Sequence, residues 1–159
     1  MSITHCIKDG NKIDPACGSG NFLTETYLAL RQLENEVIRA LIDAGKGQAA
    51  GQIMFGDSAH TPIRVSIGQF YGIEINDFAV AVAKTALWIA ESQMLKKTED
   101  IVHLQIDFLP LKSYTNIHEA NALRIDWETV VPKNQLNYIM GNPPFVGLSL
   151  RNESQQNDM

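Results

Sequence analysis

Cysteine is scarce in this chain of 159 residues, which has only Cys6 and Cys17. No Cys-x-x-Cys pair occurs, and the two cysteines form no metal-binding pattern with the four histidines. A structural zinc ion needs four suitably spaced ligands, so we expect no metal site. We also expect no disulfide, because thiols stay reduced in the cytoplasm, the compartment predicted below.

Long apolar runs are missing as well. None approaches the roughly 20 residues that a membrane-spanning helix needs. The first six residues lack the charged-then-apolar order of a signal peptide. The sequence therefore predicts a cytoplasmic protein that has no membrane partner.

Concentrated positive charge is the third absence. The net charge is −5, and basic residues such as Arg64, Lys96 and Lys97 are scattered along the chain. A protein that grips nucleic acid usually contacts phosphates through a basic surface. If this protein acts on DNA, most backbone contacts should come from parts outside this sequence. The composition, 45% hydrophobic and 19% charged, suits one globular domain.

What is present is an alternation of short apolar runs with long helical patterns. The predicted strands are Lys12–Asp14, Phe70–Ile75, Ile117–Leu123 and Leu136–Met140. No clear pattern covers 45–69, which is rich in glycine, or 96–111. The polar tail, 151–159, is predicted to be disordered.

Two helices are predicted between these strands. The first runs over 21–44 and ends at Gly45; the second runs over 78–95 and is capped by Asn76 or Asp77. Each has an apolar face. The first stripe contains Phe22, Leu23, Tyr27, Leu30, Leu33, Val37, Ile38, Leu41 and Ile42. The second contains Val80, Ala83, Leu87 and Ala90.

This order of elements predicts an α/β fold in which crossover helices connect the strands of a parallel sheet. Ligands of such sheets bind beyond the carboxyl ends of the strands. Four polar motifs occupy these positions, one after each predicted strand or at its end: Asp14–Gly20, Glu74, Asn121 and Asn142. Their agreement predicts one site at that edge.

The loop Asp14–Gly20 is a candidate cofactor loop. Gly18 and Gly20 permit a close backbone approach, and the loop leads into a helix N-terminus that suits a polar or anionic group. A dinucleotide site would have a third glycine and an acid about 20 residues on. Leu23 stands where that glycine would be, and Glu74 is much further along. A tight turn without a ligand is an alternative, as is a merely solvated Glu74.

The segment Asn142-Pro143-Pro144-Phe145 suits chemistry at an exocyclic amine. The lone pair of such an amine is delocalised into its ring, and two acceptors at its hydrogens would localise it. The side-chain oxygen of Asn142 and the carbonyl oxygen of Pro143 can supply them, and the prolines fix that carbonyl. Phe145 could stack on a base rotated out of a duplex. The alternative is a proline turn that places a phenylalanine in the core.

Together these segments resemble a known family. The stretch Asp14–Phe22 is similar to the first motif of DNA amino-methyltransferases, and Gly141–Phe145 is similar to their amine motif. The order of the two is that of the gamma class. The stretches Phe70–Met94 and Asn121–Trp127 resemble the methyltransferase region of MmeI-type restriction–modification enzymes. The resemblance implies a Rossmann-like class I S-adenosylmethionine-dependent methyltransferase fold, with strands one to four in a partial catalytic domain over 1–150.

The resemblance also implies a cofactor, S-adenosylmethionine. The carboxylate of Glu74 would accept from both ribose hydroxyls, and Ile75 would pack on the adenine. Asp14 would help to hold the ammonium, and Asn121 would meet the edge of the adenine. Ala120 departs from the glycine that is usual in the family. The implied cofactor residues are Asp14, Ala16, Cys17, Gly18, Gly20, Glu74, Ile75, Asn121 and Ala122.

The implied reaction is methylation of adenine N6 at specific DNA sites, within a larger restriction–modification enzyme. The catalytic segment would be Asn142, Pro143, Pro144 and Phe145, with no metal. Related enzymes that act on protein glutamine or RNA usually have tyrosine at the last position, and cytosine N4 enzymes more often have serine at the first. An amino-methyltransferase that acts on RNA or on a protein glutamine remains an alternative.

A non-catalytic S-adenosylmethionine-binding fragment is the rival interpretation. The sequence shows no counterpart of the family's helical segment before Asp14, of its strands after the amine motif, or of its target-recognition domain. We therefore expect double-stranded DNA to be bound through a recognition domain outside this sequence. We also expect the strand Leu136–Met140 to expose an edge that can pair with another chain.

Overall fold

A computed structural model describes residues 10–46, 63–103 and 116–143 of the chain. Its four strands form one parallel sheet in the order β3-β2-β1-β4. The predicted α/β fold is therefore confirmed. The strands are β1 (Asn11–Asp14), β2 (Phe70–Glu74), β3 (Ile117–Glu119) and β4 (Leu136–Ile139).

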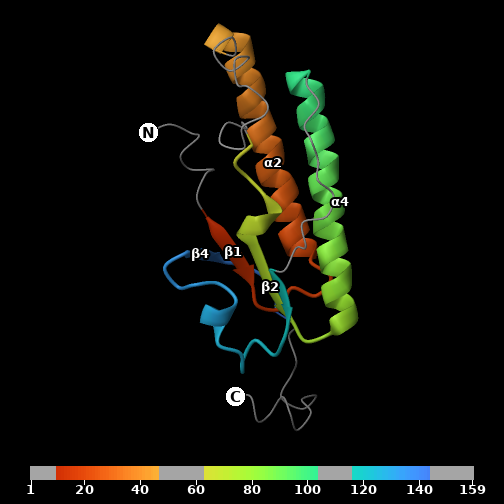
Figure 1. The fold of residues 1–159 in the computed structure, drawn as a ribbon, viewed down its shortest axis with the longest axis vertical. Coiled ribbons are helices and arrows are strands. Elements are labelled where there is room, and N and C mark those ends of the chain that lie inside the picture. Colours follow the sequence, from red (N-terminus) through yellow and green to blue (C-terminus); the bar gives the residue numbers. More distant parts are fainter. Residues whose placement is uncertain (1–9, 47–62, 104–115, 144–159) are drawn as a thin grey trace.

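Two long helices, α2 (Asn21–Leu41) and α4 (Asp77–Val102), lie on one side of the sheet and extend past it (Figure 1). A strand of four residues is about 13 Å long, whereas the 21 residues of α2 span roughly 32 Å. The outer halves of the helices therefore pack on each other rather than on strands. A π-helical segment, η1 (Ile42–Lys46), continues α2, and two short 3₁₀ helices, η2 (Ile67–Gln69) and η3 (Trp127–Thr129), lie in the connections.

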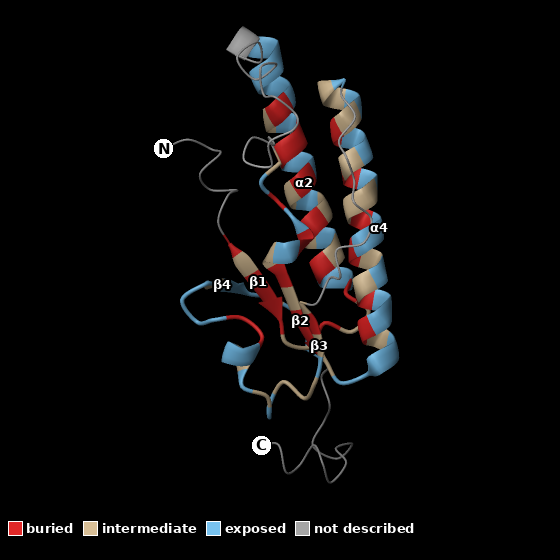
Figure 2. Cartoon of the chain, in the orientation of Figure 1, coloured by how far each residue is buried: buried red, intermediate tan, exposed pale blue. Residues whose placement is uncertain are grey.

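The main core lies between these helices and the sheet (Figure 2). Leu23 and Tyr27 of α2 and Leu87 and Met94 of α4 are buried there. The rings of Tyr27 and Phe70 meet edge to face at 5.6 Å. Each fully buried side chain of this size contributes about 1.5–3 kcal/mol, so this layer holds the helices at fixed positions over the strand ends.

A smaller core lies on the opposite side of the sheet. Ile13 and Ile73 point there, because side chains alternate along a strand, and Val130 and Val131 pack against them. The indole of Trp127 donates to the Ala122 carbonyl oxygen at 2.8 Å. The connection between β3 and β4 is thereby held over that face.

The structure extends one predicted helix and shortens one predicted strand. Asn76 caps α4 by accepting from the Ala79 amide at 3.0 Å, and the helix continues to Val102, beyond the predicted end at residue 95. The third strand ends at Glu119 and not at Leu123. The reason is that β2 ends opposite it at Glu74, so the chain beyond has no partner strand and turns.

The predicted apolar stripe of α2 is wrong in part. Phe22, Leu33, Leu41 and Ile42 are 40–50% exposed. Polar residues occupy part of the buried face in their place, as a hydrogen-bonded cluster. The Arg31 guanidinium pairs with Glu34 and donates to Thr98, which donates to Asn35. Glu34 also accepts from the backbone amides of Arg64 and Val65, and so anchors the segment before β2. Partnering of this kind makes buried charge tolerable.

The other predicted boundaries agree more closely. The α-helical part of α2 ends at Leu41, and the π-helical turn brings the helical segment to Lys46, close to the predicted end. The fourth strand matches its predicted position to within one residue. Parts of the stretches 45–69 and 96–111, and the tail over 151–159, lie outside the described residues.

Candidate functional site

The loops that follow the four strands meet at one edge of the sheet. Asp14 and Glu74 end adjacent strands, because β1 and β2 pair in register, and β4 flanks β1 on its other side. The motif at Asn121 follows β3 beyond β2, and Asn142 follows β4. In the described sheet, all four motifs lie at the same edge, as the sequence predicts.

Two glycines shape the loop after β1. Gly18 and Gly20 have φ values of 53° and 80°, in the left-handed region that disfavours side chains. Gly20 begins α2, and a Cβ there would lie 2.8 Å from the Cβ of Ala83. Any larger residue would push α2 off α4. The loop is therefore fixed by helix packing as well as by its own torsions.

The carboxylate of Glu74 joins this loop to the start of α4. One oxygen accepts from the Gly18 amide at 2.9 Å, and the other accepts from the Asn76 amide at 2.9 Å. A carboxylate has about four acceptor positions, so both oxygens retain capacity for hydroxyl donors. Glu74 is thus a structural tie and a candidate ligand for a diol.

Asp14 is almost fully buried, with 2% of its surface exposed. Its Oδ1 accepts from the Ala16 amide at 3.0 Å. Burial raises the pKa of Asp14, the Ala16 hydrogen bond lowers it, and the negative charge of Glu74 raises it further, with a net increase. The carboxylate thus carries a charge in surroundings that disfavour it.

Cys17 does not have the character of a nucleophile. Its side chain is buried, and burial together with the charges of Asp14 and Glu74 raises the pKa of its thiol to about 12. The thiol is therefore neutral at physiological pH, which disfavours a role as a thiolate nucleophile. Its sulfur fills the space beside Gly72, where a Cβ would lie 2.8 Å from it. Cys17 packs the loop onto β2.

The second loop begins where β4 leaves the sheet. The Met140 amide donates to the Ile13 carbonyl oxygen at 2.9 Å, and Gly141 follows with a φ of 150°. Asn142 and Pro143 are exposed. A Cβ on Gly141 would lie 2.9 Å from Cγ of Asp14 and nearer still to its Oδ1, so the two loops are in direct contact. Pro144 and Phe145 lie outside the described residues.

The third part of the edge is a turn after β3. The side-chain oxygen of Asn121 accepts from the Leu123 amide at 2.9 Å, so this oxygen already takes part in an internal turn. The carbonyl of Ala122 is held by Trp127. Ile75, after β2, is 69% exposed and so accessible to a ligand.

Sequence reasoning missed two side chains at this edge. Leu123 is 71% exposed and Phe78 is 75% exposed, although both are large and apolar. Each lies four residues after the end of a strand: Leu123 follows β3 on a turn, and Phe78 follows β2 on the first turn of α4. A large apolar residue just beyond a strand end was the signal that could have found them.

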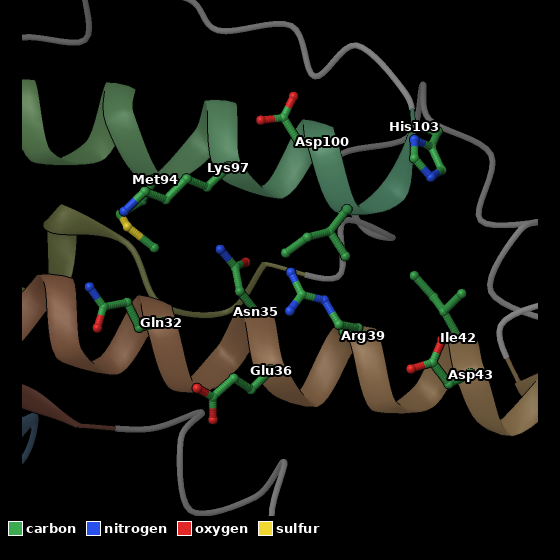
Figure 3. A pocket seen from close by; sticks show the side chains of 11 residues that line it. Gln32, Asn35, Glu36, Arg39, Ile42, Asp43, Met94, Lys97, Asp100 and His103 are labelled. Carbon is green, nitrogen blue, oxygen red and sulfur yellow. The ribbon is translucent and has the colours of Figure 1, made fainter.

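A separate groove lies away from this edge. A groove of about 670 Å³ separates the outer halves of α2 and α4, and its walls mix both charges, with Arg39 and Lys97 beside Asp43 and Asp100 (Figure 3). Within 10–46, 63–103 and 116–143, no group of His, Cys, Asp and Glu could hold a metal ion. In those same ranges no helix is long and apolar enough to cross a membrane.

Comparison with known sequences gives consistent matches. The family model described as "MmeI, DNA-methyltransferase domain" matches residues 2–159. The chain is 42% identical over 149 residues to DNA methyltransferase A of Bacillus subtilis (strain 168), a match covering 92% of this chain and 16% of that protein. It is 32% identical over 78 residues to the adenine-specific methyltransferase PglX of Streptomyces coelicolor (strain ATCC BAA-471 / A3(2) / M145), covering 49% of this chain and 5% of that protein.

A solved structure agrees with these matches. The chain is similar to the type IIL restriction-modification enzyme MmeI, solved in complex with DNA, with a TM-score of 0.81 and 41% identity. The match covers 97% of this chain and 20% of that one. The chain therefore spans a fifth or less of the length of each of these proteins.

Proposed function

This chain belongs to the family of MmeI DNA-methyltransferase domains, and we propose that it carries the methyl-transfer site of a DNA adenine methyltransferase within a larger restriction–modification enzyme. One observation carries the proposal. The glycine loop after β1 and the Asn-Pro loop after β4 touch, through Asp14 and Gly141. A donor held by the first loop and an amine held by the second would therefore meet at one edge.

The proposed cofactor is S-adenosylmethionine, which supplies an electrophilic methyl group when bound. The chain's own groups suit it. Glu74 can accept from two ribose hydroxyls, and the exposed Ile75 offers an apolar surface to a planar base. Asp14 can balance the charge of an ammonium. The backbone of Ala16, Cys17, Gly18 and Gly20 would line the amino-acid end.

The turn after β3 would meet the remaining edge of the cofactor's adenine. Asn121 and Ala122 form this turn at the end of the neighbouring strand. The Asn121 side-chain oxygen accepts from the Leu123 amide, so we propose that Asn121 contributes by fixing the shape of this turn. No protein nucleophile or metal ion is part of the proposed mechanism.

The Asn-Pro loop would prepare the target amine. The side-chain oxygen of Asn142 and the carbonyl oxygen of Pro143 would accept the two N6 hydrogens and localise the nitrogen lone pair. The same dipoles would stabilise the positive charge that develops on nitrogen. Pro144 would keep the loop rigid, and Phe145 would stack on the base. Asn142 and Pro143 are exposed and so accessible to a base rotated out of a duplex.

Adenine is proposed as the target base from the sequence of this loop. Asn142 and Phe145 differ from the serine usual for cytosine N4 and the tyrosine usual for protein glutamine or RNA. The match to an adenine-specific methyltransferase over 78 residues supports the same choice. Recognition of a DNA site would come from another part of the longer protein, and the cytoplasm is the proposed compartment.

Methylation by the complete protein that carries this chain tests the proposal. Incubation with DNA and labelled S-adenosylmethionine should yield N6-methyladenine on nucleoside analysis. Asn142→Ala should reduce the methylation rate by a factor equivalent to about 3 kcal/mol, while the affinity for S-adenosylhomocysteine stays unchanged. Recovery of N4-methylcytosine would refute the base assignment, and near-normal turnover of the variant would exclude the proposed role of Asn142.

A further inference from the structure

The contact between Gly141 and Asp14 carries a further inference, which rests on the proposed function. A Cβ on residue 141 would meet Oδ1 of Asp14 first, then Cγ at 2.9 Å and Oδ2 at 3.2 Å. The oxygen that it meets first is the one that accepts from the Ala16 amide. The atom that holds the cofactor loop is therefore the atom that the Asn-Pro loop touches.

Neither partner can move away without breaking contacts that it already makes. Asp14 is 2% exposed, and its backbone lies in a strand paired on both sides, with β2 and with β4. On the other side, the Met140 amide is bonded to Ile13, and the sulfur of Met140 accepts from the Thr26 hydroxyl at 3.7 Å. The backbone just before Gly141 is thus fixed to the sheet, and the Met140 side chain contacts α2.

The loop after Asp14 is hydrogen-bonded to β2 at two further points. Ala16 is followed by Cys17, whose amide donates to the Ile73 carbonyl oxygen at 3.1 Å, and then by Gly18, whose amide donates to Glu74. A shift of the Asp14 carboxylate would break its hydrogen bond with the Ala16 amide, which comes just before these two contacts along the loop. The position of the loop that would hold the cofactor therefore depends on what stands at residue 141.

We propose that Gly141 is a positioning residue that couples the two halves of the site, because the absence of a side chain there lets Asp14 hold the cofactor loop while Asn142 stays beside it. A larger residue at position 141 would displace the Asp14 carboxylate and weaken cofactor binding, although Gly141 is itself outside the cofactor loop. Gly141 also has a φ of 150°, which a side chain disfavours, so the same replacement would shift Asn142.

These two effects are separable by a double-mutant cycle in the complete protein. The affinity for S-adenosylhomocysteine is measured by calorimetry, and the methylation rate at saturating cofactor is measured on DNA. Gly141→Ala should weaken the cofactor affinity by about tenfold and also slow methylation. In the Asp14→Ala background the same replacement should leave the affinity unchanged, because the displaced carboxylate is gone, while methylation is slowed further by the backbone effect on Asn142.

Gly68→Ala is the matched control, because a Cβ there would meet only Ser66 Oγ, at 3.4 Å. It should change neither quantity. If Gly141→Ala does not fold, Asp14→Ala/Gly141→Ala should fold as well as Asp14→Ala by circular dichroism, and a failure of this rescue would overturn the coupling. An unchanged cofactor affinity in Gly141→Ala, or equal losses in both backgrounds, would overturn it while leaving the proposed function intact. A wild-type protein that binds no S-adenosylhomocysteine would overturn both.

Discussion

At the scale of single residues, Glu74 holds the site together before any ligand arrives. Its two oxygens accept from Gly18 and Asn76, which belong to different loops. Replacing Glu74 would remove hydrogen bonds that connect the two loops and also the proposed contacts with the ribose. Its replacement therefore tests the site more sharply than a change at an exposed position.

We predict that Glu74→Gln weakens binding of S-adenosylhomocysteine by the equivalent of about 1.5–3 kcal/mol. Glutamine offers one oxygen where two amides and two hydroxyls need acceptors, and its NH₂ group would face a donor. Titration calorimetry measures the loss. The control is Glu36→Gln on the exposed surface of α2, which should bind like the wild type. Equal affinity in the Glu74 variant would remove Glu74 from the cofactor site.

Asp14 gives a prediction of pH dependence. Burial raises its pKa in the folded protein above the usual value of 3.8, so the folded state binds a proton more readily than the unfolded chain. The ionised side chain therefore costs stability at neutral pH. This cost is relieved as the pH falls through the raised pKa, and relief is complete below the unfolded value.

Asp14→Asn should accordingly raise the melting temperature at pH 7, since asparagine keeps an acceptor for the Ala16 amide without the buried charge. The difference from the wild type should shrink as the pH is lowered toward 4. Thermal melts of both proteins across this range measure it. A gain that is constant over the whole range would show that the charge of Asp14 is not its cause.

At the scale of elements, β4 forms an edge of the described sheet. Its outer side has no partner strand within the described residues, and Tyr138 and Ile139 are 55% and 63% exposed. One face of the Tyr138 ring is approached by Lys12, whose Nζ lies 5.8 Å from the ring centroid. Ile139 thus offers the more accessible apolar contact.

We predict that the 159-residue chain self-associates through this edge. Light scattering over a concentration series should show growth in mass, and Ile139→Lys should suppress it by placing a charge in the contact. The matched control is Ile89→Lys on α4, where the isoleucine is 45% exposed but lies on a helix without free strand groups. A monomer at every concentration, or suppression by both variants, would contradict an edge-specific contact.

At the scale of the whole molecule, charge and length bear on how DNA is reached. The chain carries a net charge of −5, and it spans a fifth or less of its relatives. DNA affinity depends on phosphate contacts made by basic groups. The proposed methyl-transfer site and the surface that binds DNA are therefore expected to lie in different parts of the proposed restriction–modification enzyme.

The prediction is that this chain alone produces no mobility shift of a DNA duplex at physiological salt, whereas the complete protein does. Lowering the salt concentration should strengthen binding by the complete protein steeply, in proportion to its phosphate contacts. Tight and salt-sensitive binding by the chain alone would mean that the described surface carries a basic patch despite its net charge.

The sequence by itself determined the sheet, its parallel direction and the edge that holds the candidate site. These follow from local patterns: apolar runs that end in polar motifs, glycines at Gly18 and Gly20, and the cap at Asn76. Each of these signals lies within a few residues of the feature it predicts. The resemblance to amino-methyltransferases rested on the same short stretches, and the family match confirms it.

Only the tertiary structure decided what depends on distant partners. The end of β3 was set by the end of β2, and the buried Arg31–Glu34 pair was set by Thr98 on another helix. The contact of Gly141 with Asp14 joins residues that are far apart in sequence. Helical periodicity identifies an apolar face, but a polar side chain is buried only when a second element supplies its hydrogen bonds, and no local pattern contains that information.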